Sequence, residues 1–200
     1  NVADFRTLDN LHLTDIETGL GADDLAWIRL RSRQSRISVA LASRVDSSAP
    51  VRRASDQPTS AFHESWAEAS PTSGIYITKT IALYSSRDRA ITDPLSTALS
   101  SLAERDSFPM LVESHVRQWQ RLWDRFDLKA SCSDPDTVRA VRLQLFHVIQ
   151  SLSPHTVDLD VGVPARGLHG EAYRGHIFWD ELFVLPLLNL RTPELSKSLL

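Results

Sequence analysis

The most chemically varied stretch of the sequence is GLHGEAYRGHIFWDE, at residues 167–181. It gathers three acids, two histidines, an arginine, a tyrosine and a tryptophan. Four of the seven glycines of the chain lie in or just before it, namely Gly162, Gly167, Gly170 and Gly175. Glycines at this density predict an irregular loop with tight turns and close backbone approaches. Such a loop can present several polar side chains to a pocket: Arg166, His169, Glu171, Arg174 and His176.

Trp179 and Asp180 close this stretch, just where an apolar run begins. A carboxylate can accept two hydrogen bonds from sugar hydroxyl groups, and an indole ring can cover the apolar face of a sugar. The pair therefore indicates a carbohydrate ligand, with Asp180 at the mouth of the next helix.

Three other interpretations of the same residues stay open. The first is a metal site built from His169, Glu171, His176, Asp180 and Glu181, although their spacing matches no known zinc pattern. The second is a general acid and base pair formed by Glu171 and Asp180 across the loop. The third is a solvated loop with no ligand at all.

Helices must position these residues. Asp93 before Pro94 and Asp134 before Pro135 are N-cap and first-turn signals for helices over 93–105 and 135–153. Between them, 108–126 carries an apolar stripe at helical spacing: Leu111, Val112, His115, Val116, Trp119, Leu122, Trp123 and Phe126. The third helix is expected to bury Val138, Val141, Leu145, Val148, Ile149 and Leu152. Residues 178–190 are strongly apolar, and Thr192 with Pro193 begins another helix.

The first ninety residues have the sequence pattern of β-strands. Residues 25–32, 36–43 and 74–86 are short runs rich in Ile, Val, Leu and Thr that partly alternate with polar residues. Residues 45–60 are rich in Ser, Pro and Arg and are expected to form a loop. We expect an antiparallel sheet or half of a sandwich, followed by helices.

Several other residues are of types that often bind ligands, but their sequence context favours a structural role. Trp119 and Trp123 could stack on a sugar, but their place on an apolar helical stripe favours core packing. His147 is expected to be a partly buried helix residue rather than a ligand. The four arginines of RLRSRQSRIS (29–38) favour a strand with a solvated face over a nucleic-acid surface.

Composition excludes several classes of protein. Hydrophobic residues make up 42% and charged residues 24%, with a net charge of −3, which is ordinary for a folded protein without a nucleic-acid partner. The single cysteine, Cys132, excludes an internal disulfide. No apolar run approaches the roughly 20 residues that span a bilayer, and the first residues lack signal-peptide character. We therefore expect a soluble cytoplasmic protein without a metal or cofactor.

The segment VGVPARGLHGEAYRGHIFWDELFVLPLL resembles the opening of the helical domain in glycoside hydrolase family 65, which holds the maltose, trehalose and kojibiose phosphorylases and related acid trehalases. VRLQLFHVIQSLSPHT and HVRQWQRLWDRFDL resemble the preceding helices of that family. NVADFRTLDN and QSRISVALASRV resemble part of its N-terminal β-sandwich.

The resemblance implies an α+β multidomain chain. Residues 1–92 would be part of an N-terminal β-sandwich, 93–133 a helical linker, and 134–200 the first helices of an (α/α)6 catalytic barrel. The Trp-Asp pair of the family falls on Trp179 and Asp180, which would bind the glucosyl unit. Arg174 and His176 match the same run and would line or brace that pocket.

The chemistry implied by the resemblance is inverting cleavage of an α-glucosyl disaccharide by phosphate or by water. The family commonly has the spacing W-D-x-E, whereas here Glu181 directly follows Asp180. The Glu-Tyr-His-containing motif with the general acid of the family does not occur in these residues. We therefore expect a fragment that carries no catalytic acid, since it also begins without Met and ends inside a helical pattern.

The alternative is a non-catalytic sugar-binding or structural β-sandwich module, and another (α/α)6 carbohydrate enzyme is a third interpretation. The sequence leaves open whether the parent protein is a phosphorylase or a hydrolase, which disaccharide it takes, and its oligomeric state.

Overall fold

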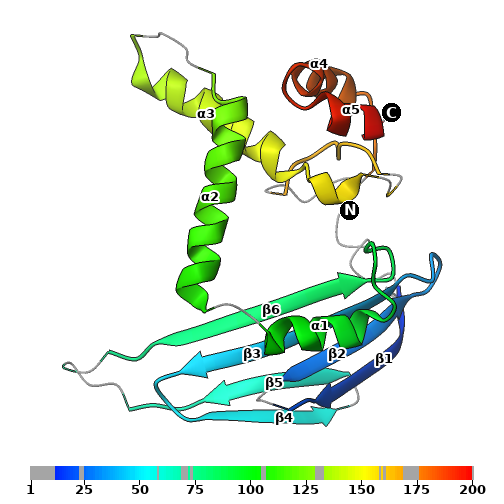
Figure 1. Ribbon diagram of the computed structural model, residues 1–200, viewed down its shortest axis with the longest axis vertical. Helices are drawn as coiled ribbons and strands as arrows, with labels where there is room; N and C mark the ends of the chain where they lie inside the picture. The colour runs from blue at the N-terminus through cyan, green and yellow to red at the C-terminus, as the bar shows by residue number, and fades with distance from the viewer. Residues whose placement is uncertain are drawn as a thin grey trace, which may run out of the picture. The chain divides into compact units, whose positions relative to one another are not determined.

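The computed structural model describes residues 12–22, 25–57, 59–68, 72, 74–104, 107–128, 133–157, 159, 161–168 and 176–199. The chain divides into two compact units, residues 1–108 and 109–200, which are described separately. The first is built on β-strands and the second on helices, as the sequence predicts (Figure 1). No helix among the residues described is both long enough and apolar enough to cross a membrane.

The first unit contains a four-stranded antiparallel sheet with the order β1-β2-β3-β6. Its strands are β1 (Leu13–Leu20), β2 (Ala26–Ser32), β3 (Ser38–Ser47) and β6 (Ile77–Ser85). The last three confirm the strands expected from alternating β-branched and apolar residues. Strand β1 was not predicted. A register irregularity between Thr14 and Glu17, with Asp15 at φ 51°, interrupts its alternation.

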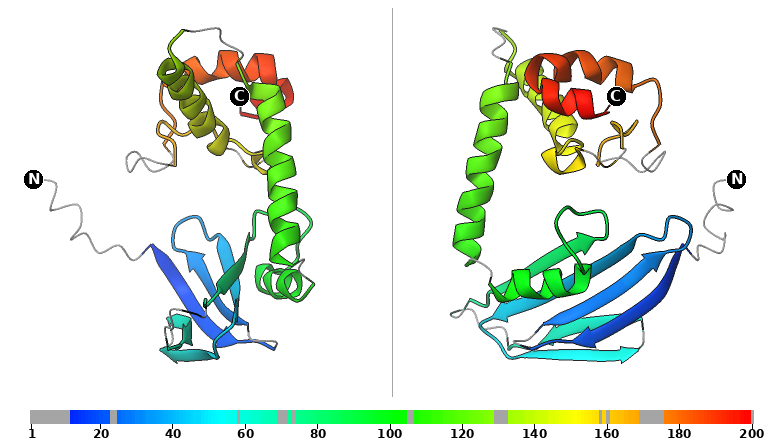
Figure 2. Two further views of the ribbon diagram at one scale, coloured as in Figure 1. Left: turned by 90° about the vertical axis from the view of Figure 1, so that its left-hand side faces the viewer. Right: turned by 45° about the vertical axis from the view of Figure 1, so that its right-hand side comes forward.

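A two-stranded sheet of β4 (Val51–Gln57) and β5 (Ser60–Ser65) completes the β part. It packs on β1 and β2, on the opposite face of the four-stranded sheet from helix α1 (Figure 2). The expectation of a loop over 45–60 was therefore wrong. Serine and arginine are tolerated on a strand with a solvated face, so their abundance did not exclude a hairpin.

Helix α1 (Pro94–Ala103) packs on β3 and β6. Leu25, Ala42, Ala98 and Leu102 form the buried cluster between helix and sheet, with Trp27, Ala82, Tyr84 and Leu99 around it. The N-cap prediction is confirmed, because an Asp93 carboxylate oxygen accepts the Ser96 N–H at 2.7 Å. This hydrogen bond is the main cause that lowers the pKa of Asp93.

The other face of β6 is exposed, and apart from Lys79 its outward side chains are apolar. Ile77, Ile81 and Leu83 are 60%, 51% and 61% exposed. Leu83 pairs with Leu41 and Ile81 with Ser43, so these side chains continue one surface across two strands. The hairpin β4–β5 packs on β1 and β2 and also contacts β3.

The second unit contains α2 (Phe108–Phe126), α3 (Pro135–Gln150), a short 3₁₀ helix (Pro154–Thr156), α4 (Glu181–Arg191) and α5 (Pro193–Leu199). Its core joins Phe126, Ile149, Val163 and Leu188, with Trp119, Leu122, Leu152, Val184 and Leu199 packed around them. The last half of α2 and the last turns of α3 thus meet the middle of α4.

The predicted helical stripes are only partly buried. On α2, Leu111, Val112 and Val116 are exposed, whereas Phe126 is buried. On α3, Val141 is exposed, whereas Leu145 and Ile149 are buried. The periodicity predicted the helices correctly. It could not show that other helices pack against only part of each apolar stripe.

The starts of α3 and α5 were predicted with unequal success. Asp134 accepts hydrogen bonds from the backbone of Asp136 and from both the backbone and the hydroxyl of Thr137. These bonds, the Thr137 hydroxyl first, lower the pKa of Asp134. Thr192 precedes Pro193 as expected, but its buried hydroxyl makes no capping hydrogen bond. Only its carbonyl oxygen accepts, from the Ser196 N–H at 2.9 Å.

Candidate functional site

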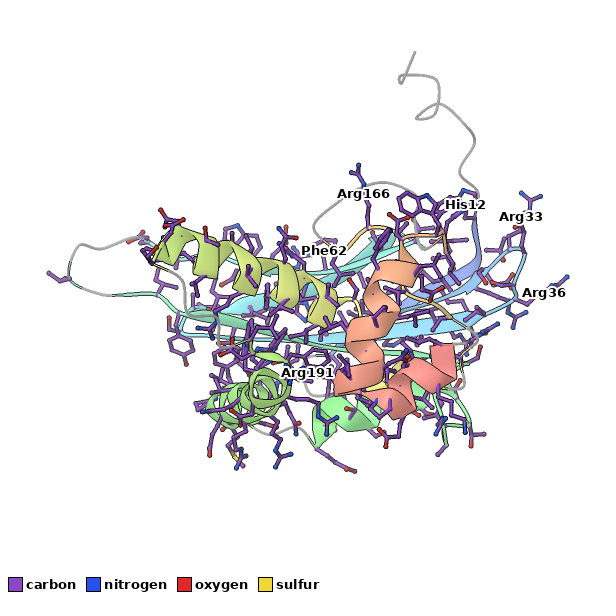
Figure 3. The ribbon with its side chains drawn as sticks, turned by 90° about the horizontal axis from the view of Figure 1, so that it is seen from above. His12, Arg33, Arg36, Phe62, Arg166 and Arg191 are labelled. Atoms are coloured by element: carbon purple, nitrogen blue, oxygen red, sulfur yellow. The ribbon has the colours of Figure 1, made fainter. Side chains whose placement is uncertain are left out.

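The glycine-rich loop reaches α4 through two short described segments, residues 161–168 and 176–180. Val163 is 5% exposed and belongs to the helical core, which anchors the first segment. The Ala165 N–H donates to the carbonyl oxygen of His176 at 3.3 Å, so the two segments are tied to each other. Arg166 extends away from the loop (Figure 3), while His169, Glu171 and Arg174 lie outside the described residues.

The loop also approaches the first turn of α4 very closely. A Cβ atom at Gly162 would lie 2.6 Å from Ile177 Cδ1 and 2.9 Å from Glu181 Oε1. Only a residue without a side chain fits this contact unless its neighbours shift. The same Glu181 Oε1 accepts the Val163 N–H at 2.9 Å.

Asp180 enters α4 in helical conformation, with φ −53° and ψ −30°. Its carbonyl oxygen accepts the Phe183 N–H at 3.0 Å, but its side chain makes no capping hydrogen bond. Among the described residues no ion pair or hydrogen bond engages this half-buried carboxylate.

Trp179 lies beside Asp180 and is 67% exposed. Its ring meets Phe183 edge-on, with the ring centroids 5.5 Å apart and the planes at 74°. The two ring planes are far from parallel, so Phe183 does not stack face to face on the indole, and most of the Trp179 surface stays exposed. Leu182, Phe183 and Leu190 are also exposed, so an apolar stripe of α4 continues from the tryptophan.

His176 is exposed, and its ring stacks on Phe178 with a centroid distance of 6.0 Å. Of the four residues predicted for sugar binding, the structure places His176, Trp179 and Asp180 within one short turn. Arg174 lies outside the described part. Among the described residues, the grooves of about 590, 510 and 220 Å³ do not include Trp179 or Asp180 in their linings.

The described residues contain no group of three or more His, Cys, Asp or Glu that could hold a metal ion. The metal interpretation also used His169 and Glu171, which lie outside those residues. The acid and base pair of Glu171 with Asp180 is untested for the same reason.

The tryptophans of α2 line a groove of about 590 Å³ together with His115, Val116, Gln120, Asp124, Asp127 and Arg142. The Arg142 guanidinium lies over the Trp123 ring, 5.1 Å from its centroid, and its Nε is 3.4 Å from Asp127 Oδ1. Trp119 contacts Phe146 at a centroid distance of 5.0 Å. Protein groups thus contact both rings, in agreement with the packing interpretation. His147 is half-buried beside Phe146, as expected.

A polar groove of about 510 Å³ lies on the sheet of the first unit. Arg29 pairs with Glu17, and Arg31 with Asp15, across strands β1 and β2. Arg33 and Arg36 extend from the turn that joins β2 to β3 (Figure 3). This arrangement confirms a strand with a solvated face, on which Arg29 and Arg31 pair with acids of the neighbouring strand.

Comparisons with known proteins also match the chain in two parts. Residues 1–122 match the N-terminal domain of glycosyl hydrolase family 65, and residues 142–200 match the central catalytic domain of that family. An uncharacterized glycosyl hydrolase of Mycobacterium tuberculosis is 38% identical over 98% of this chain. The chain covers 15% of that relative.

Two further relatives are phosphorylases by name. Trehalose 6-phosphate phosphorylase of Lactococcus lactis is 37% identical over 61% of this chain and 16% of its own length. Kojibiose phosphorylase of Halothermothrix orenii is 33% identical over the same shares. A solved structure of a kojibiose phosphorylase candidate from the human microbiome has a TM-score of 0.64, with 22% identity over 92% of this chain and 24% of that one. At this identity it shows the shared fold.

Proposed function

The chain belongs to glycosyl hydrolase family 65, and from this premise we propose that it is a segment of an enzyme that cleaves an α-glucosyl disaccharide with inversion of configuration. Relatives with an assigned activity include a trehalose 6-phosphate phosphorylase and a kojibiose phosphorylase. The chain spans about 15% of the length of the relatives it matches, so further parts of the site would come from outside these residues.

The observation that carries the proposal is the turn of Trp179 and Asp180 at the start of α4. It combines a carboxylate without a capping bond and an indole that is largely exposed. The carboxylate would accept hydrogen bonds from two glucosyl hydroxyl groups, and the indole would cover the apolar side of the ring. His176 and Arg174 would line or brace the same subsite.

Inverting cleavage needs a carboxylic acid that protonates the glycosidic oxygen and a nucleophile on the opposite face of the sugar. In the proposed reaction the nucleophile is inorganic phosphate, or water helped by a base. Neither role falls to Asp180, which holds the sugar, and the general acid would lie outside these residues. The partners are then the disaccharide and inorganic phosphate, with no cofactor.

We also propose residues 1–92 as part of the β-sandwich, 93–133 as a linker, and 134–200 as the start of the (α/α)6 barrel. Because α1 packs on the sheet, the linker would be anchored on the sandwich by its first helix.

The test is an assay of the full-length protein with maltose, trehalose, trehalose 6-phosphate and kojibiose, each with and without phosphate. Release of a glucose phosphate only when phosphate is present would identify a phosphorylase, and release of free glucose without phosphate a hydrolase. No turnover of any α-glucosyl disaccharide would contradict the proposal. The 200-residue chain alone is expected to show none, because it lacks a general acid.

A further inference from the structure

We propose that Glu181 is a positioning residue for the sugar subsite. Its carboxylate holds the glycine loop against the first turn of α4 and thereby fixes the orientation of Trp179 and Asp180. This inference rests on the proposed function, because it assigns Glu181 a role toward the subsite argued above.

The first observation is the hydrogen bond from the Val163 N–H to Glu181 Oε1, at 2.9 Å. Eighteen positions separate the two residues, so the bond joins the loop to the helix rather than two neighbours on one helix. Val163 is buried in the helical core, and a carboxylate acceptor strengthens the bond. The loop end of this connection is therefore rigid.

The second observation is the close approach at Gly162. A Cβ atom there would meet Ile177 and the same Glu181 Oε1 at less than 3.0 Å. Relief would require the Ile177 side chain and the Glu181 carboxylate to move, and that movement would pull Oε1 away from the Val163 N–H. The absence of a side chain at Gly162 thus preserves the hydrogen bond.

The third observation is the position of Glu181 directly after Asp180, at the first residue of α4. Because Asp180 is already helical and its side chain is unengaged, its orientation follows from that of the turn. Within the described residues, two hydrogen bonds tie this turn and its approach to the loop: Val163 to Glu181, and Ala165 to His176. Loss of the first would remove one of the connections that hold the turn of Trp179 and Asp180 to the loop.

The test uses four variants of the full-length protein: Glu181→Ala, Glu181→Gln, Gly162→Ala and Glu194→Ala. Glu181→Ala removes the acceptor and should lower kcat/KM roughly tenfold or more, because small displacements of a substrate-binding group are costly to catalysis. Glu181→Gln keeps an amide oxygen that can accept the same N–H. It should stay within about threefold of the parent activity. Its kcat/KM should keep the pH dependence of the parent.

Gly162→Ala should lower kcat/KM in the same direction but by less than Glu181→Ala, because the side-chain ends that it meets, Ile177 Cδ1 and Glu181 Oε1, can shift. Glu194→Ala removes an exposed carboxylate from α5 and should leave kcat/KM unchanged. Circular dichroism would show which variants fold. If Glu181→Ala does not fold, Glu181→Gln and Gly162→Ala still decide the question.

Two results would overturn the inference. An equal loss for Glu181→Gln and Glu181→Ala would mean that the negative charge itself acts on the substrate. Full activity in Gly162→Ala or in Glu181→Ala would mean that the connection does not matter. Asp180→Ala separates this failure from that of the proposed function. An inactive Asp180→Ala beside a fully active Glu181→Ala refutes only the positioning role, whereas a fully active Asp180→Ala refutes the subsite itself.

Discussion

The first turns of α1 and α4 both follow an aspartate, but only one of these carboxylates caps its helix. Asp93 is extended, at φ −135° and ψ 120°, and its side chain accepts the Ser96 N–H. Asp180 is helical, at φ −53° and ψ −30°, and its side chain accepts no N–H of the turn. The first carboxylate caps its helix, and the second makes no capping hydrogen bond.

The next residue in the chain explains the difference. Proline disfavours helical backbone at the residue before it, so Pro94 keeps Asp93 extended, and Pro135 does the same for Asp134. An extended N-cap residue directs its side chain at the free N–H groups of the first turn. Glu181 follows Asp180 and imposes no such restriction. The residue that follows each aspartate therefore accounts for the difference. An aspartate before proline caps its helix, and the aspartate before Glu181 does not.

The largest expected effect is on catalysis by Asp180→Ala in the full-length protein. Losing a sugar contact that is made in the transition state should cost about 2 kcal/mol or more, which is roughly a 30-fold fall in kcat/KM. Steady-state kinetics with the preferred disaccharide would measure it. Asp93→Ala is the matched control and should leave kcat/KM unchanged. An equal fall in kcat/KM in that variant would contradict the different roles assigned to the two aspartates.

The next effect is on stability at the other turn. Asp93→Ala removes the cap of α1 and should lower the free energy of unfolding by about 0.5–1 kcal/mol, toward the lower end because solvent screens the carboxylate. Urea denaturation of the variant and the parent would measure this loss. Asp93→Asn keeps an acceptor oxygen and should recover most of it. A cap that contributes nothing would leave all three proteins with the same midpoint.

The capping aspartates should also make stability depend on pH. The pKa of Asp93 and that of Asp134 are lowered in the folded protein, so the folded state favours their charged forms. Their contribution is complete above the unfolded pKa of about 3.9 and is lost as the pH falls through the lower folded pKa. Denaturation curves at pH 5 and near pH 3 should show the loss for the parent and a smaller one for Asp93→Ala. An identical loss in both would exclude Asp93 as a source.

The smallest expected effect is that of Asp180→Ala on stability. Because this side chain makes no capping bond, its removal should change the free energy of unfolding by less than about 0.5 kcal/mol. Urea denaturation beside Asp93→Ala would compare the two directly. A loss as large as that of Asp93→Ala would show that Asp180 has a structural role after all.

Much of the fold could be predicted from the sequence because the signals are local. Asp-Pro pairs mark the starts of α1 and α3, and β-branched alternation marks β3 and β6. The hairpin β4–β5 escaped prediction because its strands are recognised by pairing with each other rather than by composition. Strand β1 escaped because the irregularity near Asp15 breaks its alternation.

For the candidate site, the sequence indicated the binding residues but not the contact that connects the loop to the helix. The types of Trp179 and Asp180 indicated a sugar ligand, and the resemblance to a family gave the pair its role. The contact of Glu181 with Val163 could not be foreseen, because it joins residues far apart in sequence through the path of an irregular loop. Glycine at position 162 was the one local sign of that contact, since glycines mark close backbone approaches.

Helix α2 is continuous from Phe108 to Phe126, yet its two halves have different surroundings. Phe108, Met110, Val112 and Val116 near its start are exposed, while Trp119, Leu122 and Phe126 near its end pack into the helical core. Opening of a helix is governed by the contacts that it must break. Amide hydrogens of the first half should therefore exchange with solvent deuterium through local fraying. Those of the last two turns should exchange only when the packing against α3 and α4 is lost, so a single helix would show two exchange regimes.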